Sequence, residues 1–393
     1  MKRVLKIYCG SWLNASRDKR ELSVCRELGM ETLVMDKGQP GDSFREDEVD
    51  GYKVYHFSTR PLGKAQWLIP LNRILSFFIW SWKARKFQAD IISGHNMSGL
   101  FVGYLSNLGN RHKAKLVYDS HEFAIGEADG KSKAYIWALR HLERFIMRRC
   151  AFSIMVNGSI ADEVQRIHRL KDRPVVARNM PPYWELDPEE TARVRGEFLS
   201  ALQLPENPFL VMYHGMLLPG RGIEEMLRAT AMVPGTGAIV LGNAPDPKYD
   251  VSSLRTLAGE LGIQDRVLFH PAVPVEVLQN YVGAVDISIN SLITTVNRNH
   301  YFSLPNKYFE AIQSLTPLIA NNGPEKSRLI QEYGIGLLVD PEKPEDIATA
   351  ICRMRDDQEF YAACKENLKR AKRELCWENE KAALKEAYRK IMQ

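Results

Sequence analysis

The feature that most constrains the fold is the regular alternation of short, β-rich apolar segments with stretches of helical periodicity. Such alternation is typical of βα units, in which each strand joins a parallel sheet and the next helix covers one of its faces. In the first half of the chain, strands are expected at 4–8, 31–35, 52–57, 90–93, 115–119, 152–156 and 175–178. The chain therefore predicts an α/β protein built on parallel sheets.

This alternation breaks once, at 180–184, which contains two adjacent prolines, and a charged stretch follows at 187–195. The prolines and the change in composition make this the best candidate for a linker. A chain of 393 residues is also longer than one core usually supports. A second series of strands is expected at 209–214, 238–242, 267–269, 286–290, 317–320 and 336–339.

We therefore predict two doubly wound parallel-sheet domains in tandem. The first spans 1–182 and the second spans 183–376, with a final helix at about 377–393 packing back on the first domain. Ligands of open α/β sheets bind beyond the carboxyl ends of the strands, so a ligand is expected in the cleft between the two domains.

Composition narrows the function classes. Lys+Arg 53 against Asp+Glu 48 leaves a net charge of +5, which does not by itself indicate nucleic-acid binding, and no nucleic-acid motif is present. The six cysteines form no CxxC pair, so neither a metal cage nor a disulfide framework is expected. No signal-peptide h-region is found, nor an apolar run of the roughly 20 residues that span a bilayer. These features predict a cytoplasmic protein.

The most informative segment is 302–310. Ser303 is predicted to cap a helix whose first turn contains Pro305. A helix start offers free backbone N–H groups and a positive dipole end, which suits a diphosphate. Glu310, about two turns into that helix, has the acceptor oxygens needed to bind a ribose diol. A capped helix with a surface glutamate explains the same pattern.

A glycine-rich turn at 214–222 is the second signal. Its glycines, Gly215, Gly220 and Gly222, permit a tight turn and close backbone approach. Arg221 can contact phosphate oxygens in a bidentate manner. Taken alone, such a turn is equally typical of an ordinary βα loop.

Together these segments resemble the donor site of the family 4 glycosyltransferases, which have the GT-B fold. The resemblance covers most of the chain, and its motifs occur in the family's order and spacing. The motif from Ser303 to Lys307, followed by Glu310, is the most specific and is similar to the branch that builds bacterial surface polysaccharides. The other matching segments are 117–122, 176–181, 239–243, 267–271 and 284–288.

The resemblance implies a retaining glycosyltransferase that takes a sugar from a nucleotide-diphosphate sugar. Arg221 would neutralise the leaving diphosphate in place of a metal, so no metal or other cofactor is expected. Lys307 would assist it or form a structural salt bridge, and His121 would approach the transferred sugar. The departing phosphate would itself help to take the acceptor proton. The donor-binding residues implied are Gly220, Gly222, Ser303, Leu304, Pro305, Asn306 and Glu310.

The sequence departs from the family pattern at three places. Many members have a glutamate where this chain has Phe302, so recognition of the sugar must differ. Arg221 replaces a lysine and keeps its charge. A glycine-rich turn expected after the first strand is instead the segment 9–16, in which Gly10 is the only glycine.

The partners expected are a nucleotide sugar and a glycan or lipid-linked acceptor, with peripheral contact to an anionic membrane. Apolar and aromatic residues recur at helical spacing over 67–82, and basic residues follow at 83–86. A second stretch, 136–149, combines Trp137 with several arginines. Such helices can lie in a membrane interface, although ordinary packing helices have similar apolar faces.

Two other function classes stay open from the sequence. One is a nucleotide-sugar epimerase or hydrolase of the same fold, which Phe302 and the membrane-like face disfavour. The other is a non-catalytic subunit that binds a nucleotide sugar or scaffolds a partner transferase, which the presence of both Arg221 and Glu310 disfavours.

Overall fold

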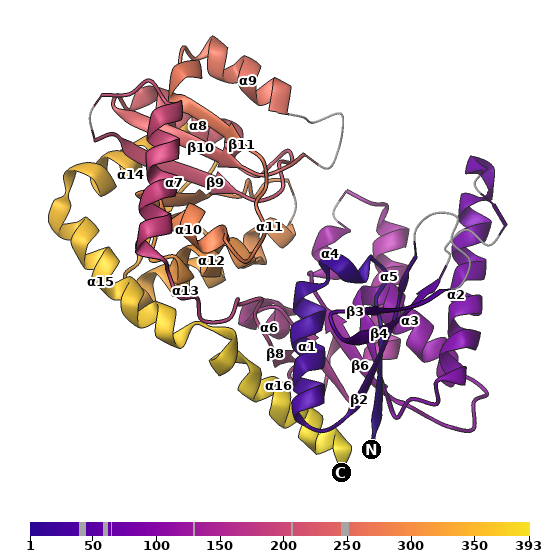
Figure 1. The fold of residues 1–393 in the computed structure, drawn as a ribbon. Coiled ribbons are helices and arrows are strands. Elements are labelled where there is room, and N and C mark those ends of the chain that lie inside the picture. The colour runs from indigo at the N-terminus through magenta and orange to yellow at the C-terminus, as the bar shows by residue number, and fades with distance from the viewer. Residues whose placement is uncertain are drawn as a thin grey trace. The chain divides into compact units, whose positions relative to one another are not determined.

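The computed structural model describes residues 1–38, 45–57, 62–63, 65–128, 130–205, 207–244, 251–296 and 298–393. Its contacts divide into two units, of which the first contains residues 1–178 and 380–393 and the second contains residues 179–379. The domain boundaries predicted from the sequence are 182 and 376. Each unit is a sheet flanked by helices (Figure 1).

The first unit is built on an eight-stranded sheet of order β3-β4-β2-β1-β5-β6-β7-β8. Every pairing is parallel except that of β3 with β4. The strands β2 to β4 lie on one side of β1, and the later strands β5 to β8 lie on the other. The strand order therefore reverses between β1 and β5. The strands are β1 Arg3–Ile7, β2 Glu31–Lys37, β3 Arg45–Val49, β4 Tyr52–Phe57, β5 Ile91–His95, β6 Lys115–Ser120, β7 Phe152–Met155 and β8 Val175–Val176.

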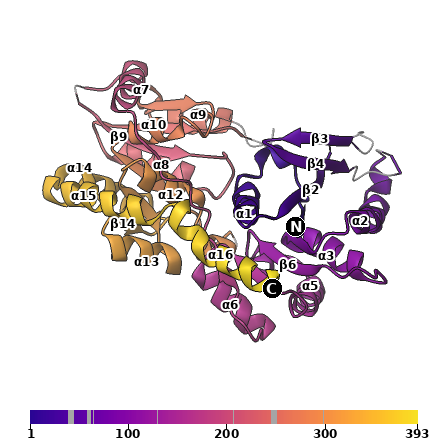
Figure 2. The same ribbon diagram turned by 60° about the horizontal axis from the view of Figure 1, so that its bottom comes forward.

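Alternation along β1 decides which helices cover which face. Leu5 and Ile7 share an apolar core with side chains of α2 and α3, whereas Lys6 contacts Glu21 of α1 on the other face. Figures 1 and 2 show α2, α3 and α5 on one side of this sheet and α1 on the other. The helices of this unit are α1 Ser16–Glu27, α2 Ile69–Lys86, α3 Asn96–Asn107, α4 Ala124–Glu127, α5 Lys133–Met147 and α6 Gly158–His168, with short 3-10 turns at Trp12–Asn14 and Gln66–Leu68.

The second unit is built on a six-stranded, all-parallel sheet of order β11-β10-β9-β12-β13-β14. Here the order reverses between β9 and β12. Every predicted strand of both series is present, with small differences at its ends, so the doubly wound α/β class is confirmed. The strands are β9 Phe209–His214, β10 Thr236–Leu241, β11 Val267–His270, β12 Ile287–Asn290, β13 Leu318–Asn321 and β14 Gly336–Val339.

Helices cover both faces of the second sheet, and two apolar cores fill the space between them and the strands. The helices are α7 Pro188–Ala201, α8 Ile223–Met232, α9 Val251–Glu260, α10 Leu278–Gly283, α11 Arg298–Phe302, α12 Asn306–Gln313, α13 Pro324–Tyr333, α14 Pro344–Asp356 and α15 Gln358–Glu374, with a 3-10 turn at Gln264–Arg266. The last helix of the chain is α16 Trp377–Met392.

The prediction that the charged stretch 187–195 belongs to a linker is wrong, because this stretch forms most of α7. The Asp187 carboxylate accepts hydrogen bonds from the backbone N–H groups of Glu189 and Glu190, and Pro188 occupies the first turn. This is a regular helix start. The charges lie on the outer face, while Val194 and Phe198 are buried in the core.

The last helix, α16, carries the chain from the second unit into the first. Its buried Tyr388 hydroxyl donates to Glu21 on α1, and Lys381 and Lys385 both pair with Glu27. In Figure 1 this helix, in yellow, lies beside α1. The C-terminal segment is therefore a structural part of the first unit.

Candidate functional site

Two loops meet at the point where the strand order of the second sheet reverses. One is the glycine-rich turn after β9, and the other follows β12. Gly222 has φ 76° and caps α8, and a Cβ built on it would lie 2.1 Å from the Ser291 carbonyl oxygen. The Ile293 N–H donates to the Gly220 carbonyl at 3.0 Å. Open α/β sheets bind ligands at such a reversal, so the predicted turn lies where a ligand is expected.

The side chain of Lys307, a residue in the first turn of α12, extends to the glycine-rich turn and lies against Gly215. Its ammonium group donates to the Tyr213 hydroxyl at 2.6 Å and lies 3.9 Å from the centre of that ring. A Cβ on Gly215 would lie 2.4 Å from the Lys307 Cε, so any other residue there would require the lysine side chain to shift.

Burial, and after it the nearby Arg221 guanidinium, lower the pKa of Lys307 to about 7 against the opposing effect of Glu310. Within the described ranges, no carboxylate lies within ion-pair distance of Lys307. The alternative role predicted for this lysine, a structural salt bridge, is thus not found there. Two cations held together at this point favour the binding of an anion.

Glu310 lies on the same helix with both carboxylate oxygens held. One accepts from His214 Nε2 at 3.0 Å and the other from Asn306 Nδ2 at 2.5 Å. His214 ends β9 and was not predicted as a site residue, although its position at the carboxyl end of a strand is a usable signal. Because an ionised carboxylate offers about four acceptor positions, Glu310 retains capacity for a diol.

The predicted cap at Ser303 is wrong. The helix α12 begins at Asn306 after Pro305 at the N-cap, and no side chain caps it. The Ser303 hydroxyl instead donates to the His300 carbonyl of α11 at 3.3 Å, because residues 298–302 form a short helix of their own. Consequently Glu310 lies just past the first turn of α12, closer to the helix start than the two turns predicted.

The loop between α11 and α12 is anchored by Leu304, whose side chain is buried in the core of the second unit. The backbone of residues 304–307 therefore has a fixed place at the start of an eight-residue helix. The first N–H groups of a helix have no partner within the helix, so they are available to an anion.

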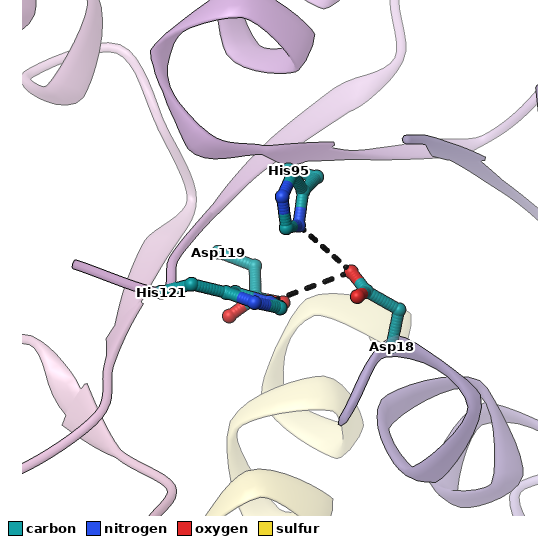
Figure 3. Close-up of side chains that lie close together, drawn as sticks. All are labelled: Asp18, His95, Asp119 and His121. Carbon is teal, nitrogen blue, oxygen red and sulfur yellow. Dashed lines mark hydrogen bonds and ion pairs between the residues drawn. The ribbon is translucent and has the colours of Figure 1, made fainter. Parts of the chain in front are cut away.

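In the first unit, His121 lies just beyond the carboxyl end of β6. Its Nε2 lies 3.0 Å from an Asp119 oxygen and 3.5 Å from an Asp18 oxygen (Figure 3). The Asn96 side chain accepts a hydrogen bond from the backbone N–H of His121 at 2.9 Å. The other predicted site residues all belong to the second unit.

Lys6 is the cation that holds this cluster together. Its fully buried ammonium group lies 2.7 Å from Asp18 Oδ1 and 2.8 Å from Asp119 Oδ2, and it also contacts Glu21. Burial opposes the charge, but the three carboxylates outweigh it and raise the pKa of Lys6. Burial likewise opposes the charge of Asp119, yet Lys6 and then Arg17 bring its pKa well below the usual range.

Asp18, His95, Asp119 and His121 bring their ligand atoms within 4.8 Å of one another, and these residue types can hold a metal ion. The Lys6 ammonium, however, already contacts the same oxygens of Asp18 and Asp119. A metal ion would have to displace this buried cation, so the geometry favours an ion-pair network.

The two histidine rings of the cluster, His95 and His121, differ in how readily they are protonated. Their centres lie 4.1 Å apart. Burial opposes protonation of His121, but Asp119 and Asp18 outweigh it and raise its pKa. At His95, burial outweighs the hydrogen bond that the ring donates to Asp18 and lowers the pKa. Of the two rings, His121 therefore favours protonation more than His95 does, and its side chain is 20% exposed.

Residues 194–371 match the family model described as "Glycosyl transferases group 1". The D-inositol 3-phosphate glycosyltransferase of Thermomonospora curvata is 26% identical over 48% of this chain and 44% of its own length, so the chain spans about half of that relative. The lipopolysaccharide core biosynthesis glycosyltransferase LpsD of Rhizobium meliloti is 23% identical over 90% of this chain and 88% of its own length.

Among solved structures, HepE of Anabaena in complex with UDP-glucose is similar over the full length of both chains. It has a TM-score of 0.77 and 17% identity. This likeness confirms the GT-B fold that the sequence predicts.

We expect the pKa values of the two clustered histidines to differ in opposite directions from the ordinary value of about 6.5. In an NMR pH titration of the folded protein, His121 should titrate above that value and His95 below it, because the carboxylates prevail only at His121. His121→Gln and His95→Gln spectra assign the signals, and the unfolded chain supplies the reference. Titration of both rings at the reference value, or in the reverse order, would contradict the network.

Proposed function

We propose that this chain, whose residues 194–371 match the model of the group 1 glycosyl transferases, is a retaining glycosyltransferase that uses a nucleotide-diphosphate sugar. The observation that carries the proposal is the pair of cations Arg221 and Lys307 at the strand-order reversal of the second sheet. A diphosphate is the part of such a donor that this pair fits. The UDP-glucose bound by HepE supports this donor class.

Each donor residue has a distinct task. Backbone N–H groups at the start of α12 hold the diphosphate, and Arg221 with Lys307 neutralises its charge. Glu310, oriented by His214 and Asn306, binds the ribose hydroxyls. Since the two cations supply the positive charge, we propose that the reaction proceeds without a metal.

In the transfer step, the bond between the anomeric carbon and the phosphate oxygen breaks as the acceptor oxygen bonds to that carbon on the same face. The acceptor proton moves to the departing phosphate oxygen. Negative charge grows on the leaving diphosphate, where fixed cations stabilise the transition state more than the ground state. His121, which is partly exposed, donates a hydrogen bond to the transferred sugar.

The first unit carries an apolar and basic surface suited to a membrane. Trp67, just before α2, is 79% exposed. Phe78 on α2 is 58% exposed, and Trp137 on α5 is 64% exposed. α3 lies between these helices, since Phe77 packs on Phe101 and Tyr104 on Phe145. The exposed basic residues beside them are Arg73, Lys86, Arg140, Arg148 and Arg149.

We therefore propose that α2 and α5 rest on an anionic membrane surface, where apolar contact and charge attraction act together. None of the helices in the described ranges is long and apolar enough to cross a bilayer. The acceptor would then be a glycan or a lipid-linked sugar at that surface. The likeness to LpsD, named for lipopolysaccharide core biosynthesis, supports a role in bacterial surface polysaccharide synthesis.

Loss of Arg221 should remove catalysis but not the fold. We expect Arg221→Ala to lower turnover by about 10²–10³-fold, the usual effect of removing a group that stabilises transition-state charge. Release of nucleoside diphosphate from the donor measures this, after a thermal-shift screen of nucleotide sugars has identified the base. Arg228→Ala, which removes an exposed arginine from the same turn-and-helix segment, is the control. Near-normal turnover of Arg221→Ala would refute the assignment, and no response to any nucleotide would favour a scaffold.

Donor binding should weaken as the pH rises through about 7, the pKa of Lys307 in the free protein. Below that pH Lys307 is already charged; above it, binding the diphosphate must take up a proton, which lowers affinity by up to about tenfold per pH unit. Calorimetric titration with UDP-glucose between about pH 6 and 8.5 tests this, because its diphosphate has no ionisation in that range. Lys307→Arg should remove the dependence, and an unchanged profile in that variant would contradict it.

Membrane binding should depend on the exposed side chains of the α2 segment. Replacing Trp67 and Phe78 by alanine removes two exposed rings, and we expect flotation with vesicles containing an anionic phospholipid to fall several-fold. Met232→Ala with Val275→Ala removes exposed apolar side chains of the second unit and serves as the control. If wild-type protein does not float with these vesicles, the membrane proposal fails.

A further inference from the structure

Lys326, in the first turn of α13, is another buried lysine of the second unit, and the reaction proposed above gives it no task. Its side chain is fully buried, and its ammonium group donates to the His300 carbonyl of α11 at 2.6 Å. In the described part of the chain no carboxylate lies within ion-pair distance of it, and burial lowers its pKa to about 7. One hydrogen bond to a neutral carbonyl does not offset the cost of burying a lysine, so this side chain lowers the stability of the free protein.

The loop between β13 and α13 packs directly against α11. Gly323 is the N-cap residue of α13, and a Cβ built on it would lie 2.6 Å from the Tyr301 carbonyl oxygen and 3.4 Å from the Lys326 Nζ. The absence of a side chain at Gly323 therefore lets the α11 backbone approach closely. The start of α13 thus holds α11 in two ways, by this backbone contact and by the hydrogen bond from Lys326 to His300.

The ring of His300 connects α11 to the turn that contains Arg221. Its Nδ1 lies 2.8 Å from the Ile293 carbonyl oxygen, and because a carbonyl can only accept, Nδ1 carries the proton. The Ile293 N–H in turn donates to the Gly220 carbonyl at 3.0 Å. A Cβ built on Gly220 would lie 3.7 Å from the His300 Cε1, so the ring also packs against the turn itself. Hydrogen bonds therefore lead from His300 to the residue that precedes Arg221.

The His300 carbonyl connects α13 to the other half of the donor site. It accepts a second hydrogen bond, from the Ser303 hydroxyl at 3.3 Å, and the Ser303 N–H donates to the Asn299 carbonyl at 2.7 Å. Ser303 is the first residue of the segment 303–307, which leads into the first turn of α12. The Lys326 ammonium therefore shares an acceptor with the residue at which this segment begins.

We propose that Lys326 and His300 are positioning residues of the donor site, which fix the turn that carries Arg221 and the segment 303–307 relative to each other. Their effect on the reaction rests on the function proposed above, whereas the hydrogen-bond path itself does not. Neither residue needs to touch the donor. A displacement of about 1 Å at the reacting groups can lower turnover about 10²-fold, so the loss of this support should reduce turnover.

Amide hydrogen exchange in the full-length protein, without any ligand, tests the path itself. Lys326→Met keeps an unbranched side chain but removes the hydrogen bond, and we expect the amides of Ile293 and Ser303 to exchange at least about tenfold faster. The midpoint of thermal unfolding should not fall, because an unpaired buried cation is removed. Lys365→Met is the matched control, since Lys365 donates to the carbonyl of Leu315, which precedes β13 at the other edge of the sheet.

The control should leave both amides unchanged. Equal exchange in the wild type and Lys326→Met, or equal acceleration in both variants, would overturn the proposal. A lower thermal midpoint in Lys326→Met would also overturn it, because Lys326 would then be a residue that stabilises the fold.

Two variants of His300 separate the hydrogen bond of the ring from its bulk. The amide nitrogen of His300→Asn takes the place of Nδ1 and can donate to the Ile293 carbonyl, whereas His300→Phe fills the space without donating. We expect release of UDP from UDP-glucose, or from the donor that the thermal-shift screen identifies, to slow at least about tenfold in His300→Phe and in Lys326→Met. His300→Asn and Lys365→Met should stay near the wild-type rate, and equal losses in both His300 variants would refute the hydrogen-bond path.

The two measurements distinguish failure of this inference from failure of the proposed function. If the wild type releases no nucleoside diphosphate from any nucleotide sugar, the transferase proposal fails, and hydrogen exchange alone decides whether Lys326 and His300 hold the two segments together. If the wild type is active and exchange responds as expected, but Lys326→Met turns over normally, the path is only structural and the positioning role fails.

Discussion

The first unit depends on the buried charge of Lys6. A lysine ammonium in the centre of an apolar strand is tolerated only when it is paired, because an unpaired buried ion costs several kcal/mol. The partners come from α1 and from β6, and Tyr388 of the last helix donates to the same Glu21. A single cation thus requires that helix α1, the neighbouring strands and the C-terminal helix all dock correctly. The same requirement fixes the place of His121, which binds two of these carboxylates.

Lys307 in the second unit shows the opposite electrostatic design. Lys6 is surrounded by carboxylates, which raise its pKa, whereas Lys307 is buried beside another cation, and its pKa falls to about 7. A compensated buried charge stabilises the fold of the free protein. An uncompensated buried charge lowers the stability of the free protein, and an anion that binds beside it restores the lost stability. This arrangement is usual at functional sites. The contrast supports a structural role for Lys6 and a ligand-binding role for Lys307.

The two units share one feature of their topology. In each sheet the strand order reverses beside its first strand, β1 or β9, and helices diverge there to leave room at the carboxyl edge. In the second unit, glycines let Lys307 and the loop after β12 approach this edge closely. In the first unit a cavity of about 370 Å³ opens at the corresponding edge.

How much the sequence predicts follows from the range of each interaction. Strand alternation and the glycine turn depend on residues close in sequence, and both were predicted at the observed places. The edge strand β3 was missed, because Arg45–Val49 is charged and exposed and has no apolar alternation. The α7 start was missed although Asp187 and Pro188 signal it locally. The ion-pair network joins residues up to 113 positions apart, so no local pattern shows it. Its one trace is Lys6 itself, a charge inside an apolar strand, which by the cost of burial implies acidic partners elsewhere in the chain.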